Sequence, residues 1–325
     1  MLKAVNEVSQ MINEGKVLHI AGNESLLAAL PKGNWIGGTN EYFMCEEGNQ
    51  ATSQKLYASI INFDEIKISV YDETNIHKVA NDAFENGFSI VIMPYGSPVL
   101  STYGKNAPSY ENMFMRSIAG WVAGVEWGRT DIQPKAINGL DKTLHTDHAV
   151  VMHVGLPAEK TAIIDIINIF EPNNNSPIIK FMDAEAKTQI HKCLIDGKET
   201  ILSEYLKEIN QGVSVPFVGS FGGAWLNATI FSIDYDEQIV TFATPVFPGI
   251  NYRFAIELTD YPASFARAVE QRGNVTDVVF CCACYYNYLF GELEGKKSKG
   301  FNGPAAFGEI AYQLLNQTLV YITVK

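Results

Sequence analysis

The chain has 325 residues, of which 47% are hydrophobic and 18% are charged. This is enough apolar sequence to bury a sizeable core, which excludes a wholly disordered chain, and the length fits two domains or one large one. Lysine and arginine together number 24 against 36 aspartates and glutamates, so the net charge is −12. This charge repels phosphate groups and excludes broad, non-specific binding to nucleic acids or anionic membranes.

The N-terminal segment and the cysteines indicate the compartment. The first 16 residues, MLKAVNEVSQMINEGK, have the pattern of an amphipathic helix and lack the apolar centre of a secretory signal. No stretch approaches the length of apolar sequence that crosses a membrane. Five cysteines are present, and three of them crowd into CCAC at 281–284, which is untypical of a disulfide framework. We therefore expect a cytoplasmic protein without a membrane span.

Hydrophobic spacing predicts the elements of the N-terminal half. Apolar residues three or four positions apart are typical of helices, and alternating or continuous apolar runs are typical of strands. These patterns predict helices at 5–12, 24–30, 76–84 and 114–125, and strands at 16–22, 66–71, 88–96 and 149–157. Residues 93–112, rich in tyrosine, serine and proline, are expected to form a long loop. The loop either serves as a lid or a partner surface, or is an irregular covering loop held by its prolines.

The C-terminal half is richer in predicted strands. The patterns predict helices at 201–209 and 262–270, and strands at 213–219, 228–234, 238–244, 252–258, 277–286 and 318–324. Short helices among many alternating strands favour an α+β fold with mixed, mainly antiparallel sheets. Residues 171–176, EPNNNS, are linker-like. A boundary between 156 and 176 would divide the chain into 1–160 and 161–325.

Four segments resemble the FIST domain family. NWIGGTNEYF at 34–43 resembles a turn of the N-terminal FIST half. Three further segments resemble the C-terminal FIST half: ATIFSIDYDEQIVTFATPVFPGINYRFA at 228–255, DVVFCCAC at 277–284 and FGEIAYQLLNQTLVYITV at 307–324. The resemblance implies two related halves whose sheets pack together with helices outside. It also implies a small-ligand sensory module.

The sequence departs from the FIST pattern at two arginines. Asn227 stands where one arginine is expected, and Tyr285 and Tyr286 stand near the place of the other. If these arginines grip an anion in other members, this divergent relative binds a less charged ligand or has lost the site.

Glycine-rich segments suggest where a ligand would bind. The turns expected at 36–39 (IGGT) and 219–225 (GSFGGAW) would let backbone N–H groups approach an anion, although close crossing of strands also explains the glycines. Neither has the spacing of a nucleotide-binding motif. In the cleft between the halves, a ligand would meet the IGGT turn, Asn227 and Glu309. The candidate ligand-binding residues are Gly37, Gly38, Thr39, Tyr95, Asn227, Cys282 and Glu309.

The cysteine cluster has a functional and a structural interpretation. Cys282 could be a nucleophile if a nearby cation or helix N-terminus lowered its pKa, with Glu309 as acid or base. Free cysteine is also a small apolar residue of buried strands, and the C-C-x-C spacing differs from the turn that zinc sites favour. We assign no catalytic residue.

A histidine-rich segment, HTDHAVVMH at 145–153, begins at the end of the expected loop at 133–146 and continues into the next strand. His145, Asp147 and His148 offer two imidazoles and a carboxylate, but a further ligand at a useful offset is missing, and His153 is an ordinary strand residue. We expect no metal and no cofactor.

The sequence thus predicts a non-catalytic, cytoplasmic protein that senses a small molecule, with amino acids among the candidate ligands. Two alternatives stay open. One is a cysteine-dependent enzyme that uses Cys282, and the other is a scaffold that binds a protein partner through 93–112.

Overall fold

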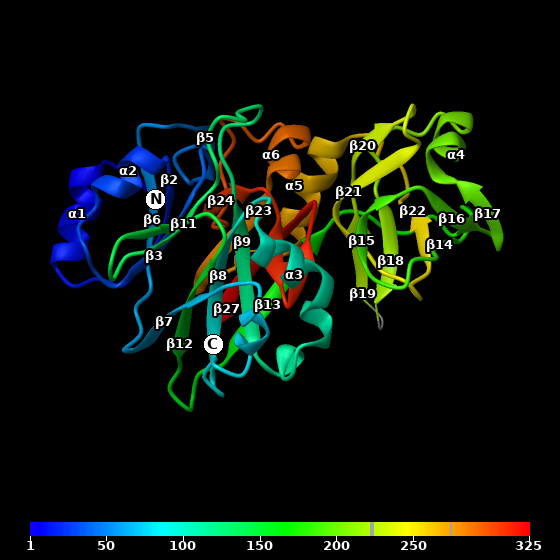
Figure 1. Cartoon of the computed structure of the whole chain (residues 1–325). Coiled ribbons are helices and arrows are strands. Elements are labelled where there is room, and N and C mark those ends of the chain that lie inside the picture. The colour runs from blue at the N-terminus through cyan, green and yellow to red at the C-terminus, as the bar shows by residue number, and fades with distance from the viewer. Residues whose placement is uncertain (222–223, 274) are drawn as a thin grey trace.

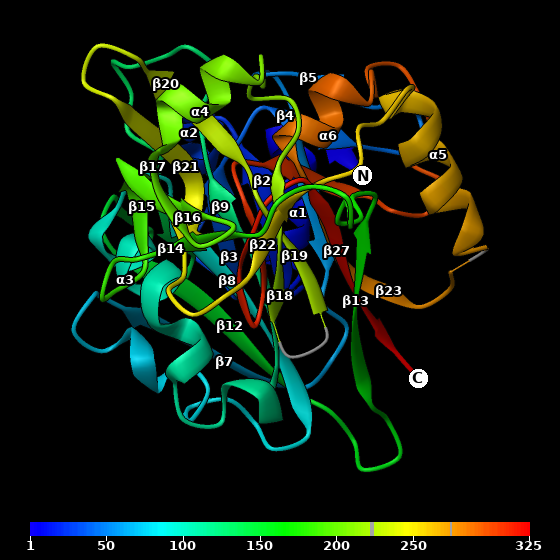
Figure 2. The ribbon, with the colours of Figure 1, turned by 90° about the vertical axis from the view of Figure 1, so that its right-hand side faces the viewer.

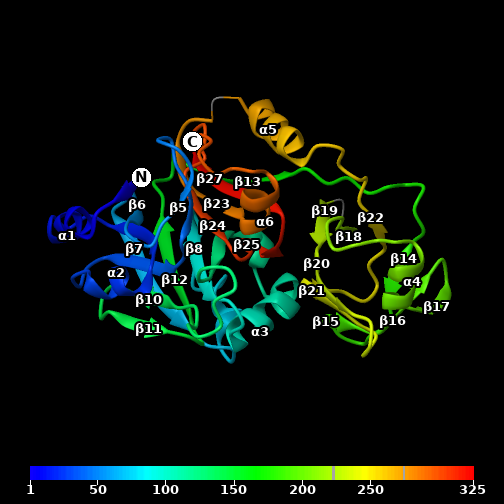
Figure 3. The same ribbon diagram turned by 90° about the horizontal axis from the view of Figure 1, so that it is seen from above.

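The computed structural model describes residues 1–221, 224–273 and 275–325 (Figure 1). The described chain forms a body of three six-stranded sheets and a smaller lobe, residues 179–254, which has two sheets of its own. Figure 3 shows this lobe at one end of the molecule and the N-terminal helices at the other. Gly222 and Gly223, from the second expected glycine-rich turn, lie outside the described residues.

The first body sheet, here the N-terminal sheet, contains strands from the first 145 residues. Its two central strands run parallel, and the other neighbours are antiparallel. In spatial order the strands are β1 (Leu2–Lys3), β6 (Leu56–Ile60), β2 (Leu18–Gly22), β3 (Trp35–Thr39), β10 (Ala136–Asn138) and β11 (Thr143–His145).

The central sheet joins strands from both ends of the chain. Its strands β8 (Gly87–Pro94) and β9 (Ser117–Ala123) run parallel, and the other neighbouring strands are antiparallel. In order the strands are β26 (Gln313–Leu315), β25 (Glu309–Ala311), β9 (Ser117–Ala123), β8 (Gly87–Pro94), β12 (Ala149–Gly155) and β7 (Glu65–Tyr71).

The C-terminal sheet also contains one parallel pair and strands distant in sequence. In order its strands are β13 (Ala162–Asn168), β27 (Thr318–Val324), β23 (Val278–Cys284), β24 (Gly303–Ala306), β4 (Tyr42–Met44) and β5 (Gln50–Ala51). Strand pairing therefore crosses residue 160 in both this sheet and the central one. The division into 1–160 and 161–325, and a relation between the two halves, stay predictions.

The lobe is inserted between β13 and the helix α5 (Tyr261–Gln271), and it faces the viewer in Figure 2. Both of its sheets are antiparallel. The larger sheet has β17 (Lys198–Ile201), β16 (Lys192–Ile195), β14 (Ile179–Phe181), β22 (Tyr252–Phe254), β18 (Phe217–Phe221) and β19 (Ala224–Ala228); the smaller has β15 (Lys187–Ile190), β21 (Ile239–Val246) and β20 (Ile230–Asp234). Phe181, Phe217 and Phe242 pack in the core that these sheets enclose.

Short helices cover the sheets. They are α1 (Val5–Asn13), α2 (Glu24–Ala29), α3 (Pro98–Asn106), α4 (Leu202–Glu208), α5 (Tyr261–Gln271) and α6 (Tyr285–Phe290), with single 3₁₀ turns η1 (Ile76–Lys78), η2 (Ala107–Ser109) and η3 (Met113–Met115). Asn23 caps α2, because its Oδ1 accepts a hydrogen bond from the Ser25 N–H at 3.0 Å. The expected combination of α and β structure in mixed sheets is confirmed.

One large hydrophobic core lies where the three body sheets meet. Ile36 comes from the N-terminal sheet, Ile92 and Trp121 from the central sheet, and Phe280 and Ile322 from the C-terminal sheet, and all are buried. Residues from both ends of the chain therefore stabilise the body together.

Three expected elements are wrong. The helix expected at 114–125 is η3 followed by β9, whose Gly120 lies against β8 so closely that a Cβ would be 2.0 Å from Val91 O. The helix expected at 76–84 is only the turn η1. The loop expected at 93–112 contains α3, which begins at Pro98 because the Ser97 hydroxyl accepts from the Leu100 N–H at 3.2 Å.

The turn expected at 36–39 is also wrong, because IGGT is part of the buried strand β3. Its glycines permit close packing: a Cβ on Gly38 would lie 2.7 Å from Ile92 Cγ2 and 2.8 Å from Trp121 Cη2. Within the described residues, no helix combines the length and the apolar character that crossing a bilayer requires.

Gly38→Ala is expected to lower the free energy of unfolding by about 1–3 kcal/mol, because the added methyl group overpacks the contact between two sheets. The matched control is Gly212→Ala, where a Cβ would meet no atom within 4 Å. Urea denaturation of both variants measures the effect. Equal stabilities would contradict the close packing described here.

Candidate functional site

A loop at 125–134 connects β9 to β10, and Thr39 holds both of its ends. The Gly124 N–H donates to Thr39 O at 2.9 Å, and the Lys135 N–H donates to Thr39 Oγ1 at 2.9 Å. The Thr39 N–H in turn donates to Lys135 O at 2.9 Å. The end of β3 therefore fixes where this loop leaves and rejoins the body.

Trp127 is the most prominent side chain of the loop. Its backbone N–H donates to Tyr42 Oη at 2.9 Å. Its ring stacks on Tyr285 with a centroid distance of 5.3 Å and on Phe307 at 6.0 Å. Nearly half of the Trp127 residue, 47%, is nevertheless exposed. The loop thus holds a large aromatic ring at the surface against two aromatic rings of the body.

These rings belong to a cavity of about 350 Å³, here called the aromatic cavity. The lobe contributes Phe231 and Ala243 to its walls, so the cavity lies between the lobe and the body. Its aromatic lining residues are Tyr95, Trp127, Phe231, Tyr285, Tyr286 and Phe307.

The charged side chains among the described lining residues are Glu126 and Arg129. Arg129 Nη1 lies 3.7 Å from Glu126 Oε2, and the Arg129 guanidinium also forms two hydrogen bonds of 2.7 Å to Asp131. The guanidinium is thus paired with two carboxylates, and the group of three residues has a formal net charge of −1. The aromatic cavity therefore offers apolar, planar surfaces and no isolated charge.

Asn316 and Cys284 supply polar atoms to the lining. Asn227 Nδ2 donates to Asn316 O at 3.0 Å and to Asn168 Oδ1 at 3.0 Å, which fixes the backbone beside the cavity. Asn316 Oδ1 is buried and has no hydrogen-bond partner. An unpaired buried acceptor costs free energy, and here it belongs to a residue that lines the aromatic cavity.

Glu309 lies behind this lining and is fully buried. Its Oε2 accepts hydrogen bonds from the Thr318 N–H at 3.0 Å and the Thr318 hydroxyl at 2.7 Å. Burial, opposed by these hydrogen bonds, raises the pKa of the carboxyl to about 8. The carboxyl is therefore mainly protonated at neutral pH, and the thiol of Cys284 lies beside it.

The cysteines of β23 are buried. Cys282 Sγ donates to Gly120 O at 3.1 Å within the large core, away from the aromatic cavity. Burial, followed by the nearby Glu309, raises the pKa of the Cys282 and Cys284 thiols well above the usual range. Neither environment favours the thiolate that nucleophilic chemistry requires.

The structure brings together only part of the predicted ligand site. Tyr95 lines the aromatic cavity, and Asn227 and Glu309 lie near its polar side. Gly37 and Gly38 are packed in β3.

A second cavity of about 300 Å³ is lined by Thr39. It is more polar than the aromatic cavity and has Asn23, Asn40 and Glu41 in its walls. Both cavities share Glu126 and Arg129 of the 125–134 loop.

Sequence reasoning missed Trp127, Phe231 and Phe307 as site residues. Trp127 lies in VEWGRT, where a single large aromatic residue stands among glycine and charged residues of a loop. A large aromatic residue that belongs to no predicted helix or strand has no apolar face of its own to join. This feature of the sequence could have identified Trp127 as a site residue. The stacking of Trp127 on Phe307 depends on contacts across 180 positions of sequence and had no signal.

Glu309→Gln is expected to change how stability depends on pH. The pKa of Glu309 is about 8 in the folded chain against an ordinary value of 4.5. Between these values the folded state holds the extra proton, so the free energy of unfolding falls as pH rises, by up to about 1.4 kcal/mol per pH unit. Glutamine removes this contribution. Urea denaturation from about pH 5 to 8 should show that the stability of the variant, relative to the native chain, increases as the pH rises. If the free energies of unfolding of the two proteins changed with pH in parallel, the result would contradict a buried acid at this position.

The thiols are expected to react slowly with Ellman's reagent in the folded chain at neutral pH. All five cysteines are free and buried, so five equivalents should react rapidly only after unfolding in guanidinium. Rapid labelling of a single cysteine before unfolding would instead favour the cysteine-dependent enzyme.

Comparison with known proteins corrects the family. No curated protein and no solved structure matches the chain. The family model that matches, described as a family of unknown function (DUF6976), covers residues 3–325, and no FIST domain match is found. The resemblance to FIST domains is therefore wrong, since the short turn and strand motifs that suggested it are common in mixed sheets. The chain belongs to the family of unknown function DUF6976.

Proposed function

We propose that the protein binds a small, uncharged molecule with a planar ring in the aromatic cavity and catalyses no reaction on it. The observation that carries this proposal is the grouping of partly exposed aromatic residues around one cavity. Tyr95, Trp127 and Phe231 are each at least 40% exposed, although exposed aromatic residues that cluster are unusual on a soluble surface.

Size and lining support a small ligand. A volume of about 350 Å³ lies near the lower end of the range for small-molecule sites. Aromatic walls favour offset or edge-on contact with another ring. The paired charges of Glu126 and Arg129 give no attraction for an anion, and they favour an uncharged ring over a zwitterionic amino acid.

Asn316 supplies the one directional contact in this proposal. Its unpaired Oδ1 would accept a hydrogen bond from an N–H or O–H group of the ligand. Asn227 was expected to touch the ligand. In this proposal it acts as a positioning residue instead, because its side chain holds the backbone carbonyl of Asn316 in place.

Binding at the junction of lobe and body also accounts for a sensory role. A ligand that contacts both Phe231 and Trp127 binds best when these residues are close together. It would therefore increase the population of that arrangement at the expense of more open ones. The five free thiols fit the reducing cytoplasm that we propose as the location.

The two alternatives have less support. The buried thiols of Cys282 and Cys284 disfavour a cysteine-dependent enzyme. Much of 93–112 forms α3, whose Leu100 and Tyr103 are buried against the body, so this segment has less free surface than a partner-binding loop needs.

Thermal-shift screening of neutral ring compounds and of amino acids tests the proposal. A ligand at about 100 times its dissociation constant stabilises the folded state by about 2.7 kcal/mol. Trp127→Ala and Phe231→Ala should each weaken binding about tenfold, which is about 1.4 kcal/mol. Both side chains are partly exposed, so the variants should fold.

The matched control is Trp225→Ala, which removes an exposed tryptophan that does not line the aromatic cavity. This variant should bind like the native chain. Ligands that bind all three variants equally would contradict the proposed site, and a panel without any hit would remove the support for small-ligand binding.

A further inference from the structure

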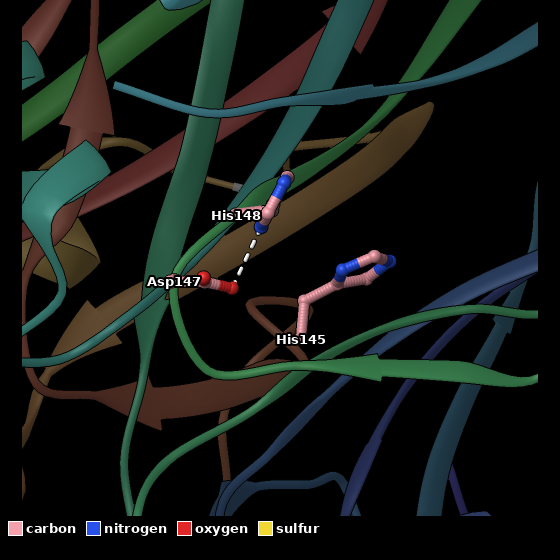
Figure 4. Close-up of side chains that lie close together, drawn as sticks. All are labelled: His145, Asp147 and His148. Atoms are coloured by element: carbon pink, nitrogen blue, oxygen red, sulfur yellow. Dashed lines mark hydrogen bonds and ion pairs between the residues drawn. The ribbon is translucent and has the colours of Figure 1, made fainter. Parts of the chain in front are cut away.

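A group of three metal-ligating side chains lies in the turn between β11 and β12, outside both cavities. His145 ends β11 of the N-terminal sheet, and Asp147 and His148 follow directly before β12 of the central sheet. Figure 4 shows the three side chains on one side of this turn. The turn thus presents two imidazoles and a carboxylate where two sheets are joined.

The distances within this group are short. One ligand atom from each residue lies within 4.8 Å of the other two. His148 Nδ1 lies 2.6 Å from Asp147 Oδ1 and donates a hydrogen bond to it, and the two imidazole ring centroids are 5.0 Å apart. His145 Nε2 is buried and has no hydrogen-bond partner. Small side-chain movements are enough to bring all three residues onto one ion.

The residue types suit a divalent cation. Imidazole nitrogen and carboxylate oxygen are both ordinary zinc ligands. They bind metals as neutral imidazole and ionised carboxylate, so protons and metal compete for the same atoms.

Further carboxylates surround the group. Asp72, held by the N–H groups of Thr74 and Asn75, lies close enough to His148 for their charges to interact. Asp141 has the same relation to His145. Together with Asp147 these residues make the surroundings of the two imidazoles negative, which attracts a divalent cation.

We propose that His145, Asp147 and His148 bind a zinc ion. Zinc takes nitrogen and oxygen ligands at about 2.0–2.2 Å in a tetrahedral arrangement, so the three ligand atoms would come to about 3.3 Å from one another. A water molecule would complete the four ligands. The hydrogen bond between His148 and Asp147 opens in this step, and the neutral ring of His148 carries its proton on Nε2 while Nδ1 binds the ion.

This proposal is independent of the ligand proposed for the aromatic cavity, because none of the three residues lines it. It replaces the expectation of no metal site. The sequence spacing offered no further protein ligand, whereas a three-residue site with bound water needs none.

Zinc titration by calorimetry, after dialysis of the purified chain against a chelator, tests the proposal. Near neutral pH we expect one zinc ion per chain with a dissociation constant of about 1 μM or lower. His145→Ala, Asp147→Asn and His148→Ala should each weaken binding about tenfold or more. Binding should also weaken at about pH 5, where protons compete for the imidazoles.

His191→Ala is the matched control, because His191 is an exposed histidine of the lobe whose Nδ1 lies near Gln238 O. It should leave zinc binding unchanged. Circular dichroism confirms that each variant is folded, which matters because the buried cysteines could bind zinc after unfolding. Absence of binding up to about 1 mM zinc, or equal binding by the native chain and His145→Ala, would overturn the proposal.

Cobalt substitution gives a second measurement that does not depend on affinity alone. Cobalt in a site with two imidazoles and a carboxylate should show the visible absorption of tetrahedral coordination. A spectrum of octahedral, hydrated cobalt that is the same in His148→Ala would also overturn the proposal.

Discussion

Close contact between three sheets in one core is the constraint on which the rest of the structure depends. The sheets meet through residues such as Ile92, Trp121 and Phe280, and they approach so closely that a Cβ at some positions would force its neighbours to shift. Gly38 is such a position. Because interiors are packed almost as densely as crystals, a shift of one sheet is transmitted to its neighbours. The position of β3, and hence of Thr39 and the loop that it holds, follows from this packing.

The junction between the lobe and the body contains a group of hydrogen-bonded polar side chains, in contrast to the apolar core of the body. Asn168, Asn227 and Asn316 connect β13, β19 and the turn before β27 by hydrogen bonds, and Thr318 continues the polar contacts to Glu309. Hydrogen bonds require specific distances and directions, so these side chains determine how the lobe is oriented. The orientation in turn sets the contact between Phe231 of the lobe and Trp127 of the body, whose ring centroids are 6.3 Å apart.

Local signals predicted the elements that have local causes. Asn23 or Ser25 indicated the start of α2, where Asn23 is the cap, and Pro262 indicated the start of α5, which Asp260 caps. The strand β9 was mistaken for a helix because Ile118 and Trp121 have helical spacing. In the strand these two residues lie on opposite faces and pack in different cores, and pairing with β8 and β25 fixes the strand. Fold class was predictable from such patterns, whereas sheet order depends on pairings between distant segments.

The candidate site was less predictable than the fold. Tyr95 was found because it follows a buried strand in a segment rich in hydroxyl groups. The IGGT segment was interpreted as a ligand-binding turn. A glycine that allows close packing cannot be distinguished in sequence from a glycine that allows a turn. The family motif that pointed to Asn227 was wrong, yet this residue does lie at the junction.

The 125–134 loop is a wall shared by two cavities of different chemistry. Thr39 holds its ends, so the stretch between them is the part that can move. Glu126 and Arg129 line both cavities, so a displacement of this loop that changes the shape of one cavity changes the other. An occupant of one cavity that displaced the loop would alter the affinity of the other cavity for its own occupant. Thermodynamic linkage requires that the second occupant alter the first affinity by the same factor.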